Sequence, residues 1–456
     1  MQLVHCALLS LQAFGLLLSV SAAPNSADVI VIGAGMAGVT AARTLVDDYN
    51  ATVIVLEARD RTGGRLYAVN TSTAGYVDAG AMWIHEATDE NPLYKLAEEQ
   101  GEPLSRLQNY YSGTVYSTDG EIVPNSFLTR AYLAQSKFRN SIASFQNEAK
   151  NDSSIPDESI YDMYDNFLTA NDIPEDQIPM NNLLVNVNFQ VLLNGNLTDL
   201  STLRYGDAKT LPALDVFLYN GFDSLVKNMA PGLDIRLETP VEKVAQGEDG
   251  VTVVTKDGDE FTASYVLSTQ SLGCLKSGYV EYDPPLSETK LKAIEDMGMG
   301  TFDKAILIYN QSYWDQTDFI MQEMETLSGK WKVFLDYYSV MEKPALIALN
   351  VAQTAQGLEK LTNEEIEESL LEALRVFYPD LPDPEEFYAT RWYEDPWSKG
   401  SYSYYAVGNE RNITEYIAEP ADRFLFAGEA ASDKPGTVLG AYLSGKREAE
   451  RISKLL

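Results

Sequence analysis

Residues 28–38 read Asp-Val-Ile-Val-Ile-Gly-Ala-Gly-Met-Ala-Gly, an apolar run that ends in three spaced glycines. The β-branched run at 28–32 predicts a buried parallel strand. Ala37, Ala41 and Leu45 follow at helical spacing, so a helix is expected directly after the glycines. Strand, glycine turn and helix in this order predict the first half of a dinucleotide-binding βαβ unit in an α/β fold.

The three glycines meet three separate needs of such a unit. Gly33, Gly35 and Gly38 are expected to allow a tight turn, close approach of backbone to a pyrophosphate, and close packing of helix on strand. The start of the helix offers free N–H groups and a positive dipole end to that phosphate. A second apolar strand at 52–56 ends at Glu57, where an acid is expected to accept the hydroxyls of an adenosine ribose. A glycine triplet alone is weak evidence, but this full set favours a bound dinucleotide over an ordinary βαβ turn.

Length and charge narrow the possible functions. The chain has 456 residues, too many for one compact core, so two domains are expected. Its 67 acidic and 34 basic residues give a net charge of −33, which argues against nucleic acid as a partner. The same negative field favours cationic small molecules, although solubility alone would also explain it.

The first residues resemble a targeting segment. A mostly apolar run from Ala7 to Val20 is followed by Ser-Ala-Ala-Pro, which predicts a signal peptide at 1–23. This run is too short to span a bilayer, and no Lys or Arg precedes it. Six Asn-x-Ser/Thr sequons support export, at Asn50, Asn70, Asn151, Asn196, Asn310 and Asn412. We therefore expect a secreted, extracellular glycoprotein.

Cysteine and histidine are scarce. Cys6 leaves with the signal peptide, so the mature chain keeps Cys274 and can form no internal disulfide. His85 is the one mature histidine, and no Cys/His cluster exists, so no metal site is predicted.

The rest of the chain alternates between helical and strand-like segments. Residues 91–219 show helical spacing, whereas 233–267 read as short strands joined by turns. Strands of another sheet are expected at 301–310 and 344–351, and a capped amphipathic helix at 362–377. A buried strand at 423–427 and a helix from about Thr437 close the chain, so the cofactor domain must be assembled from discontinuous segments.

Residues 57–65 read Glu-Ala-Arg-Asp-Arg-Thr-Gly-Gly-Arg, a glycine pair bracketed by arginines just beyond the ribose acid. Arginine's planar fork suits a pyrophosphate, and a Gly-Gly turn lets backbone approach a flat ligand. This stretch resembles the second dinucleotide signature of the flavin-containing amine oxidases. The cofactor that the resemblance implies is FAD.

The resemblance covers nearly all of the mature chain and is closest to the polyamine oxidases. Its motifs lie at 33–65, at Gly80-Ala-Met-Trp-Ile-His85, at 271–275, at 400–403 and at 426–445. It implies a Rossmann-like FAD-binding domain of the GR2 type beside an α+β substrate-binding domain. We expect the FAD-binding domain to comprise 28–95, 218–290 and 398–456, and the substrate-binding domain 96–217 and 291–397.

The resemblance also implies roles for individual residues. The residues matched to cofactor contacts are Glu57 and Glu429 for hydroxyls, Arg59 and Arg65 for pyrophosphate and flavin, Met82 and Trp83 along the isoalloxazine, Val241 at the adenine, and Thr437 and Val438 at the pyrimidine end of the flavin. A helix beginning at Thr437 would stabilise negative charge on the reduced flavin. Because no cysteine lies near residues 400–403, we expect FAD to be held non-covalently.

Lys304 is the principal catalytic candidate. It lies within an apolar strand, where an unpaired ammonium would be costly. In the family this position holds a lysine that is bridged through water to flavin N5. A lysine on the solvent face of an edge strand is the alternative interpretation.

His85 and Tyr402 complete the expected catalytic set. The Trp-Ile-His context resembles animal-type polyamine oxidases, whereas plant-type relatives carry a glutamate at this place and Glu86 is one position late. Tyr402 matches an aromatic wall opposite the flavin, while Thr437 stands where monoamine oxidases have a second tyrosine. Trp392 and Trp397 flank this region and fit either a substrate tunnel or ordinary packing.

The resemblance implies that a small-molecule amine, most simply a polyamine or its acetylated form, loses a hydride to flavin N5. The imine then hydrolyses to an aldehyde and an amine, and O₂ becomes H₂O₂. An L-amino-acid oxidase is an alternative that needs an arginine for the carboxylate, for which Arg130, Arg139, Arg204 and Arg391 are candidates. Two further alternatives are a monoamine oxidase and a secreted flavin-binding protein without catalytic activity. The oligomeric state stays open.

Overall fold

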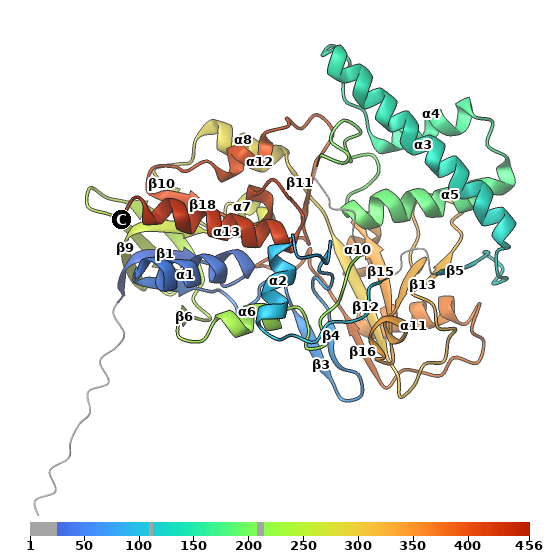
Figure 1. Ribbon diagram of the computed structural model, residues 1–456, viewed down its shortest axis with the longest axis horizontal. Coiled ribbons are helices and arrows are strands. Elements are labelled where there is room, and N and C mark those ends of the chain that lie inside the picture. The colour runs from blue at the N-terminus through green and yellow to red at the C-terminus, as the bar shows by residue number, and fades with distance from the viewer. Residues whose placement is uncertain (1–24, 109–112, 208–213) are drawn as a thin grey trace, which may run out of the picture.

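The computed structural model of the chain describes residues 25–108, 113–207 and 214–456. The predicted signal peptide at 1–23 lies outside these residues. Two large sheets form separate halves of the molecule, one around β1 and β9 and the other around β12 and β15 (Figure 1). Within the described ranges, every helix falls short of the length and apolar character needed to cross a bilayer.

The first sheet grows from the glycine-containing stretch. Its eight strands are β1 (Ser26–Ile32), β2 (Val53–Leu56), β6 (Asp234–Arg236), β7 (Val241–Gln246), β8 (Val251–Thr255), β9 (Glu260–Ser268), β10 (Glu281–Asp283) and β18 (Phe424–Phe426). The order is β10-β7-β8-β9-β1-β2-β6, and β18 also pairs with β9. Strand β1 lies parallel to both β2 and β9, as its continuous apolar run predicts. Because β1 and β18 come from opposite ends of the chain, the predicted discontinuous assembly is confirmed.

Helices cover both faces of this sheet. Val29 and Val31 of β1 pack beneath α1 (Met36–Tyr49) and α13 (Val438–Ser453). Ile30 and Ile32 point the other way, toward α8 (Glu288–Asp296) and α12 (Ile413–Ala418). The start of α13 and the start of α1 thus come to the same side of the sheet (Figure 1).

The second sheet lies in the other half of the molecule. In order, its strands are β16 (Glu386–Ala389), β12 (Phe302–Ile308), β15 (Ala345–Val351), β14 (Val333–Asp336), β13 (Phe319–Gln322) and β5 (Gly113–Tyr116). Phe302, Ile306 and Ile308 face α3 (Asn125–Asn151) and α5 (Ile178–Val185), whereas Ala305 and Leu307 face α11 (Asn363–Leu374). Strand periodicity therefore places Lys304 on the α5 face of β12.

The segment 91–219 is mostly helical, as predicted, with one exception. Its helices are α2 (Pro92–Glu99), α3, α4 (Ile160–Ala170) and α5. A short 3₁₀ turn (Glu175–Gln177) precedes α5, and a π-helical turn (Asn186–Val191) follows it. Strand β5 interrupts this pattern and pairs with β13 at the sheet edge. A four-residue strand is too short to be distinguished by periodicity.

The remaining elements are short. They are the hairpin β3 (Ala68–Thr71) and β4 (Gly75–Asp78), the pair β11 (Gly298–Met299) and β17 (Ser403–Tyr404), the short helices α6 (Ser224–Met229), α7 (Leu272–Ser277), α9 (Tyr337–Met341) and α10 (Ala352–Leu358), and the 3₁₀ turn Glu429–Ala431. The predicted capping box at the start of α11 is confirmed, with Thr362 and Glu365 bonding reciprocally. The exact domain boundaries stay predictions.

Candidate functional site

The first glycine turn leaves no room for side chains at Gly33 and Gly38. Gly33 has φ +102°, and a Cβ on Gly38 would lie 2.0 Å from the Gly33 carbonyl oxygen. These two glycines therefore allow the turn and the close packing of α1 on β1. A Cβ on Gly35, in contrast, would meet no atom nearer than 3.8 Å, so this glycine leaves open space before the backbone.

A second glycine turn lies directly against the first. The Gly63 N–H donates to the Ala34 carbonyl over 2.9 Å, and a Cβ on Gly64 would lie 3.5 Å from the Gly35 Cα. Gly35, the N-cap of α1, offers no side-chain cap to the first N–H groups of the helix. Together the two turns form a bare backbone cradle at a helix N-terminus, which suits a pyrophosphate.

Glu57 ends β2 beside this cradle and is 5% exposed. Its Oε2 accepts the Ala34 N–H over 2.7 Å, and its Oε1 accepts the Arg59 N–H over 2.9 Å. These bonds fix the carboxylate at the glycine turn and leave it lone pairs for ribose hydroxyls.

Arg59 and Arg65 join the cradle to distant parts of the chain. Arg59 makes a bidentate pair with Asp395, with N–O distances of 2.8 and 2.6 Å. Burial alone would raise the pKa of Asp395, but the Arg59 guanidinium holds that pKa below its ordinary value. Arg65 pairs with Glu429 over 2.9 Å, and Glu429 in turn accepts the Gly436 N–H over 2.8 Å. The predicted cofactor residues Arg59, Arg65 and Glu429 thus hold the segments around the cradle in place.

The start of α13 provides a second helix N-terminus at this site. Thr437 is its N-cap, and the Thr437 hydroxyl accepts the Gly440 N–H over 2.9 Å. Val438 is the first helical residue, and its N–H has no intrahelical partner. Val241, predicted to meet the adenine, begins β7 and is 4% exposed.

Lys304 is buried in β12 and is 4% exposed. Its neighbours on either side are β15 and β16, so β12 is not an edge strand. The ammonium donates to the Asp78 carbonyl over 3.0 Å and to the Gly80 carbonyl, and lies 5.9 Å from the Trp83 ring centre. Burial lowers the pKa of Lys304 to about 7, although the Asp78 charge opposes this shift. The alternative of a solvated edge lysine is therefore wrong.

Large apolar and aromatic side chains pack on the face of β12 that carries Lys304. Met82 is fully buried, and Trp83 donates from Nε1 to Gln108 over 2.7 Å. Both pack with the cluster on the α5 face of β12, as does Tyr402. The Tyr402 hydroxyl donates to the carbonyl of Leu192 over 3.2 Å, just after the π-helical turn that extends α5. Burial raises the pKa of Tyr402, so its ring stays neutral.

His85 follows Trp83 at the edge of this cluster. The two rings stack with their centres 6.2 Å apart, and His85 Nδ1 lies 2.6 Å from Asp215 Oδ2. The His85 side chain is 50% exposed, whereas Asp215 is buried. Glu86 adopts φ +58°, and its Oε2 lies 3.9 Å from Lys434 Nζ. Nothing in the sequence around Asp215 signalled its pairing with His85, 130 positions away.

Trp392 is a packing residue, because it is buried and donates from Nε1 to the Ala79 carbonyl. The Trp397 and Tyr279 rings meet edge to face, with an interplanar angle of 87°. Cys274, which is the free cysteine of the described residues, is buried, as predicted. The described ranges hold no group of three or more His, Cys, Asp or Glu that could bind a metal.

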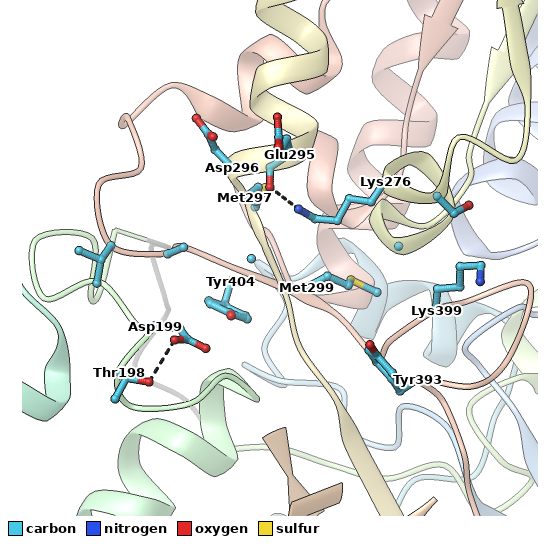
Figure 2. A pocket seen from close by; sticks show the side chains of 15 residues that line it. Thr198, Asp199, Lys276, Glu295, Asp296, Met297, Met299, Tyr393, Lys399 and Tyr404 are labelled. Carbon is cyan, nitrogen blue, oxygen red and sulfur yellow. Dashed lines mark hydrogen bonds between the residues drawn. The ribbon is translucent and has the colours of Figure 1, made fainter. Parts of the chain in front are cut away.

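A separate pocket of about 680 Å³ lies against β11 and β17, lined among others by Met299 and Tyr404, and is shown in Figure 2. Lys276 there donates to the Glu295 carbonyl, and Thr198 donates to Asp199 over 3.0 Å. None of the predicted site residues lines this pocket. We therefore place the functional site at the cradle and the Lys304 cluster.

The residues at the cradle and at the start of α13 fit a dinucleotide with a flat ring system, such as FAD. The cradle is bare of side chains where a pyrophosphate would lie, and it has a helix N-terminus behind it. Glu57 stands at its ribose end, and the start of α13 offers unpaired N–H groups to an acceptor. The N-terminal βαβ unit and residues from the last thirty positions thus serve one ligand.

Comparison with known proteins gives a consistent result. The family model described as flavin containing amine oxidoreductase matches residues 36–453. Polyamine oxidase 2 of Arabidopsis thaliana is 32% identical over 438 residues, which cover 93% of this chain and 88% of that protein. Polyamine oxidase 4 of Oryza sativa subsp. japonica is 31% identical over 460 residues, covering 98% and 93%. A solved structure of a redesigned putrescine oxidase has the same fold, with a TM-score of 0.77 at 20% identity over 94% of this chain and 99% of that one.

Proposed function

Because the chain belongs to the family of flavin-containing amine oxidoreductases, we propose that this FAD-dependent amine oxidase acts on polyamines or their acetylated forms. An amine and O₂ are its substrates. The polyamine class is supported by the two plant polyamine oxidases, and the net charge of −33 favours capture of a polycation. The observation that carries the function is the fully enclosed Lys304 ammonium beside Trp83, behind a cradle that fits FAD.

The proposed reaction converts a secondary amine, water and O₂ into an aldehyde, a primary amine and H₂O₂. FAD supplies the two-electron chemistry between the amine carbon and O₂. The protein's task is then to bind the neutral amine, orient its α-carbon and exclude bulk water. Met82, Trp83 and Tyr402 are well placed for this, since they pack in the hydrophobic cluster on the face of β12 that carries Lys304, whose ammonium lies 5.9 Å from the Trp83 ring centre.

Lys304 has the charge properties that oxygen reduction needs. Its pKa of about 7 means that Nζ can hold or release a proton near neutral pH. An ordinary lysine would keep its proton throughout turnover. We propose that Lys304 Nζ, with a bound water, provides a proton at the reacting face.

His85 is proposed to contact the substrate amine. In the tautomer in which Nδ1–H donates to Asp215, Nε2 of a neutral ring is left as an acceptor. An acceptor of this kind suits an ammonium or a secondary amine N–H. The half-exposed position of His85 favours a contact with a distal amine.

The L-amino-acid oxidase alternative lacks support from its four candidate arginines. Each already has a partner: Arg130 the Phe127 ring, Arg139 Asn188, Arg204 Asp207 and Arg391 the carbonyls of Glu359 and Leu361. A panel of spermine, N-acetylspermine, a monoamine and an L-amino acid, assayed for H₂O₂ with products identified by mass spectrometry, tests the proposal. Turnover of the amino acid alone would overturn it.

Secretion is proposed from the sequence at 1–23 and from the sequons. Four of the six sequon asparagines are exposed, namely Asn50, Asn70, Asn151 and Asn310. Expression in a eukaryotic host is expected to deliver a glycosylated chain without residues 1–23 to the medium. An intracellular chain that retains Met1 would contradict this part of the proposal.

A further inference from the structure

A buried group of charged side chains lies beneath Lys304 and has no part in the proposed reaction. Its centre is Asp78, the last residue of β4, which is fully buried. The Asp78 carboxylate accepts the Phe222 N–H over 2.8 Å and lies 3.5 Å from the Tyr337 hydroxyl. A buried carboxylate with so few donors is costly unless a cation compensates it.

Lys304, in turn, is a buried cation that needs a compensating negative charge. The Lys304 ammonium donates to two backbone carbonyls, which are dipoles and carry no net charge. Across the described ranges, no carboxylate forms an ion pair with Lys304 within 4 Å. The ammonium is nevertheless 3.0 Å from the carbonyl oxygen of Asp78, and the negative charge of that residue raises the pKa of Lys304 against the effect of burial. Asp78 is therefore the anion that supports the Lys304 ammonium without forming a direct ion pair with it.

Other charged groups face Asp78 from two further elements. Lys343, just before β15, donates to the Tyr219 carbonyl over 2.7 Å and lies 5.8 Å from the Tyr337 ring centre. Asp223, at the start of α6, opposes the Asp78 charge but is itself paired with Lys227 over 2.8 Å. Burial raises the pKa of Asp78 to about 7, while Lys304 and Lys343 act against that rise.

We infer that Asp78 is a positioning residue that sets the protonation state of Lys304, through the field of its buried carboxylate and through the Asp78 carbonyl that orients the ammonium. Lys304 and Asp78 are then two halves of one buried charge pair. The inference rests on the proposed function only in placing Lys304 at the reacting site. A purely structural Asp78, which merely caps the Phe222 N–H, is the competing account.

The test compares four FAD-loaded proteins: wild type, Asp78→Asn, Lys304→Met and Tyr337→Phe. The visible spectrum of bound FAD is followed from pH 5 to 10, and Lys304→Met identifies the titration that belongs to Lys304. Asp78→Asn keeps an acceptor for Phe222 but removes the charge, so the midpoint is expected to fall by about one pH unit. Tyr337→Phe removes a hydroxyl that donates to the Asp78 carboxylate over 3.5 Å but keeps the charge of Asp78, so its midpoint is expected to move much less than that of Asp78→Asn. An unchanged midpoint in Asp78→Asn, or an equal shift in Tyr337→Phe, overturns the inference.

A second measurement covers the case in which Asp78→Asn folds poorly. The double variant Asp78→Asn, Lys304→Met removes both buried charges, so it is expected to unfold at a higher urea concentration than Asp78→Asn alone. A double variant that is less stable than Asp78→Asn contradicts the inference. Neither measurement consumes an amine, so a failure of polyamine oxidation leaves both results decisive.

Discussion

Replacing Lys304 by methionine is expected to change how the stability of the protein depends on pH. The pKa of Lys304 falls from 10.5 to about 7 because the side chain is buried. In the unfolded chain the pKa returns to about 10.4, and each pH unit of difference is worth about 1.4 kcal/mol. The full cost of the folded ammonium is thus about 5 kcal/mol, and it applies below pH 7.

The sign of the effect follows from proton binding. Between pH 7 and 10 the unfolded chain holds the Lys304 proton while the folded chain has lost it, so raising the pH favours the folded state. The cost is fully present below the folded pKa and is relieved as the pH approaches the unfolded value. Integrated from pH 7 to pH 9, the wild type is expected to gain about 2 kcal/mol relative to Lys304→Met.

Urea unfolding at both pH values, followed by tryptophan fluorescence, measures this difference. Lys256→Met, at an exposed lysine in the β8–β9 turn, is the matched control and is expected to show no comparable gain. If the difference in unfolding free energy between wild type and Lys304→Met is the same at pH 7 and pH 9, Lys304 titrates as an ordinary lysine. The assignment of a proton donor at the reacting face would then fail.

Three further variants test the rest of the site. Glu57→Gln loses an anionic acceptor of two backbone N–H groups, so FAD affinity, measured by fluorescence titration of the apoprotein, is expected to fall roughly 30-fold, or about 2 kcal/mol. Gly38→Val places carbon 2.0 Å from the Gly33 carbonyl, and the purified protein is expected to contain almost no FAD by absorbance; normal FAD content would refute the packing role. His85→Ala removes the ring that Asp215 orients, so KM for spermine is expected to rise about tenfold with little change in kcat. A fall in kcat alone would exclude a simple binding role.

Local physical rules made much of the fold predictable from sequence. The β-branched run before Gly33 could only be buried, and the close packing of α1 demanded a glycine at Gly38. The capping box before α11 and the turns between β7, β8 and β9 were equally local. Each of these features depends on residues a few positions apart, where spacing determines contact.

The contacts that organise the site were not predictable in this way. Arg59 and Asp395 are separated by 336 positions, and only the folded chain shows that the guanidinium is bound by a carboxylate. From the sequence alone, Asp78 is one acid at the end of a short strand. Its complete burial follows from the packing of the β3–β4 hairpin against β12, where its carbonyl accepts from Lys304. Long-range pairing of this kind leaves no periodic pattern in a single sequence.

Anaerobic mixing of the FAD-loaded protein with single amines tests the central claim most directly. The absorbance of oxidised FAD, at about 450 nm, reports electron transfer from the substrate without any contribution from O₂. Spermine or N-acetylspermine is expected to bleach this absorbance rapidly, whereas a monoamine and an L-amino acid leave it unchanged. Bleaching by the L-amino acid alone, or by none of the four compounds, would contradict the account of this chain as a polyamine-oxidising enzyme.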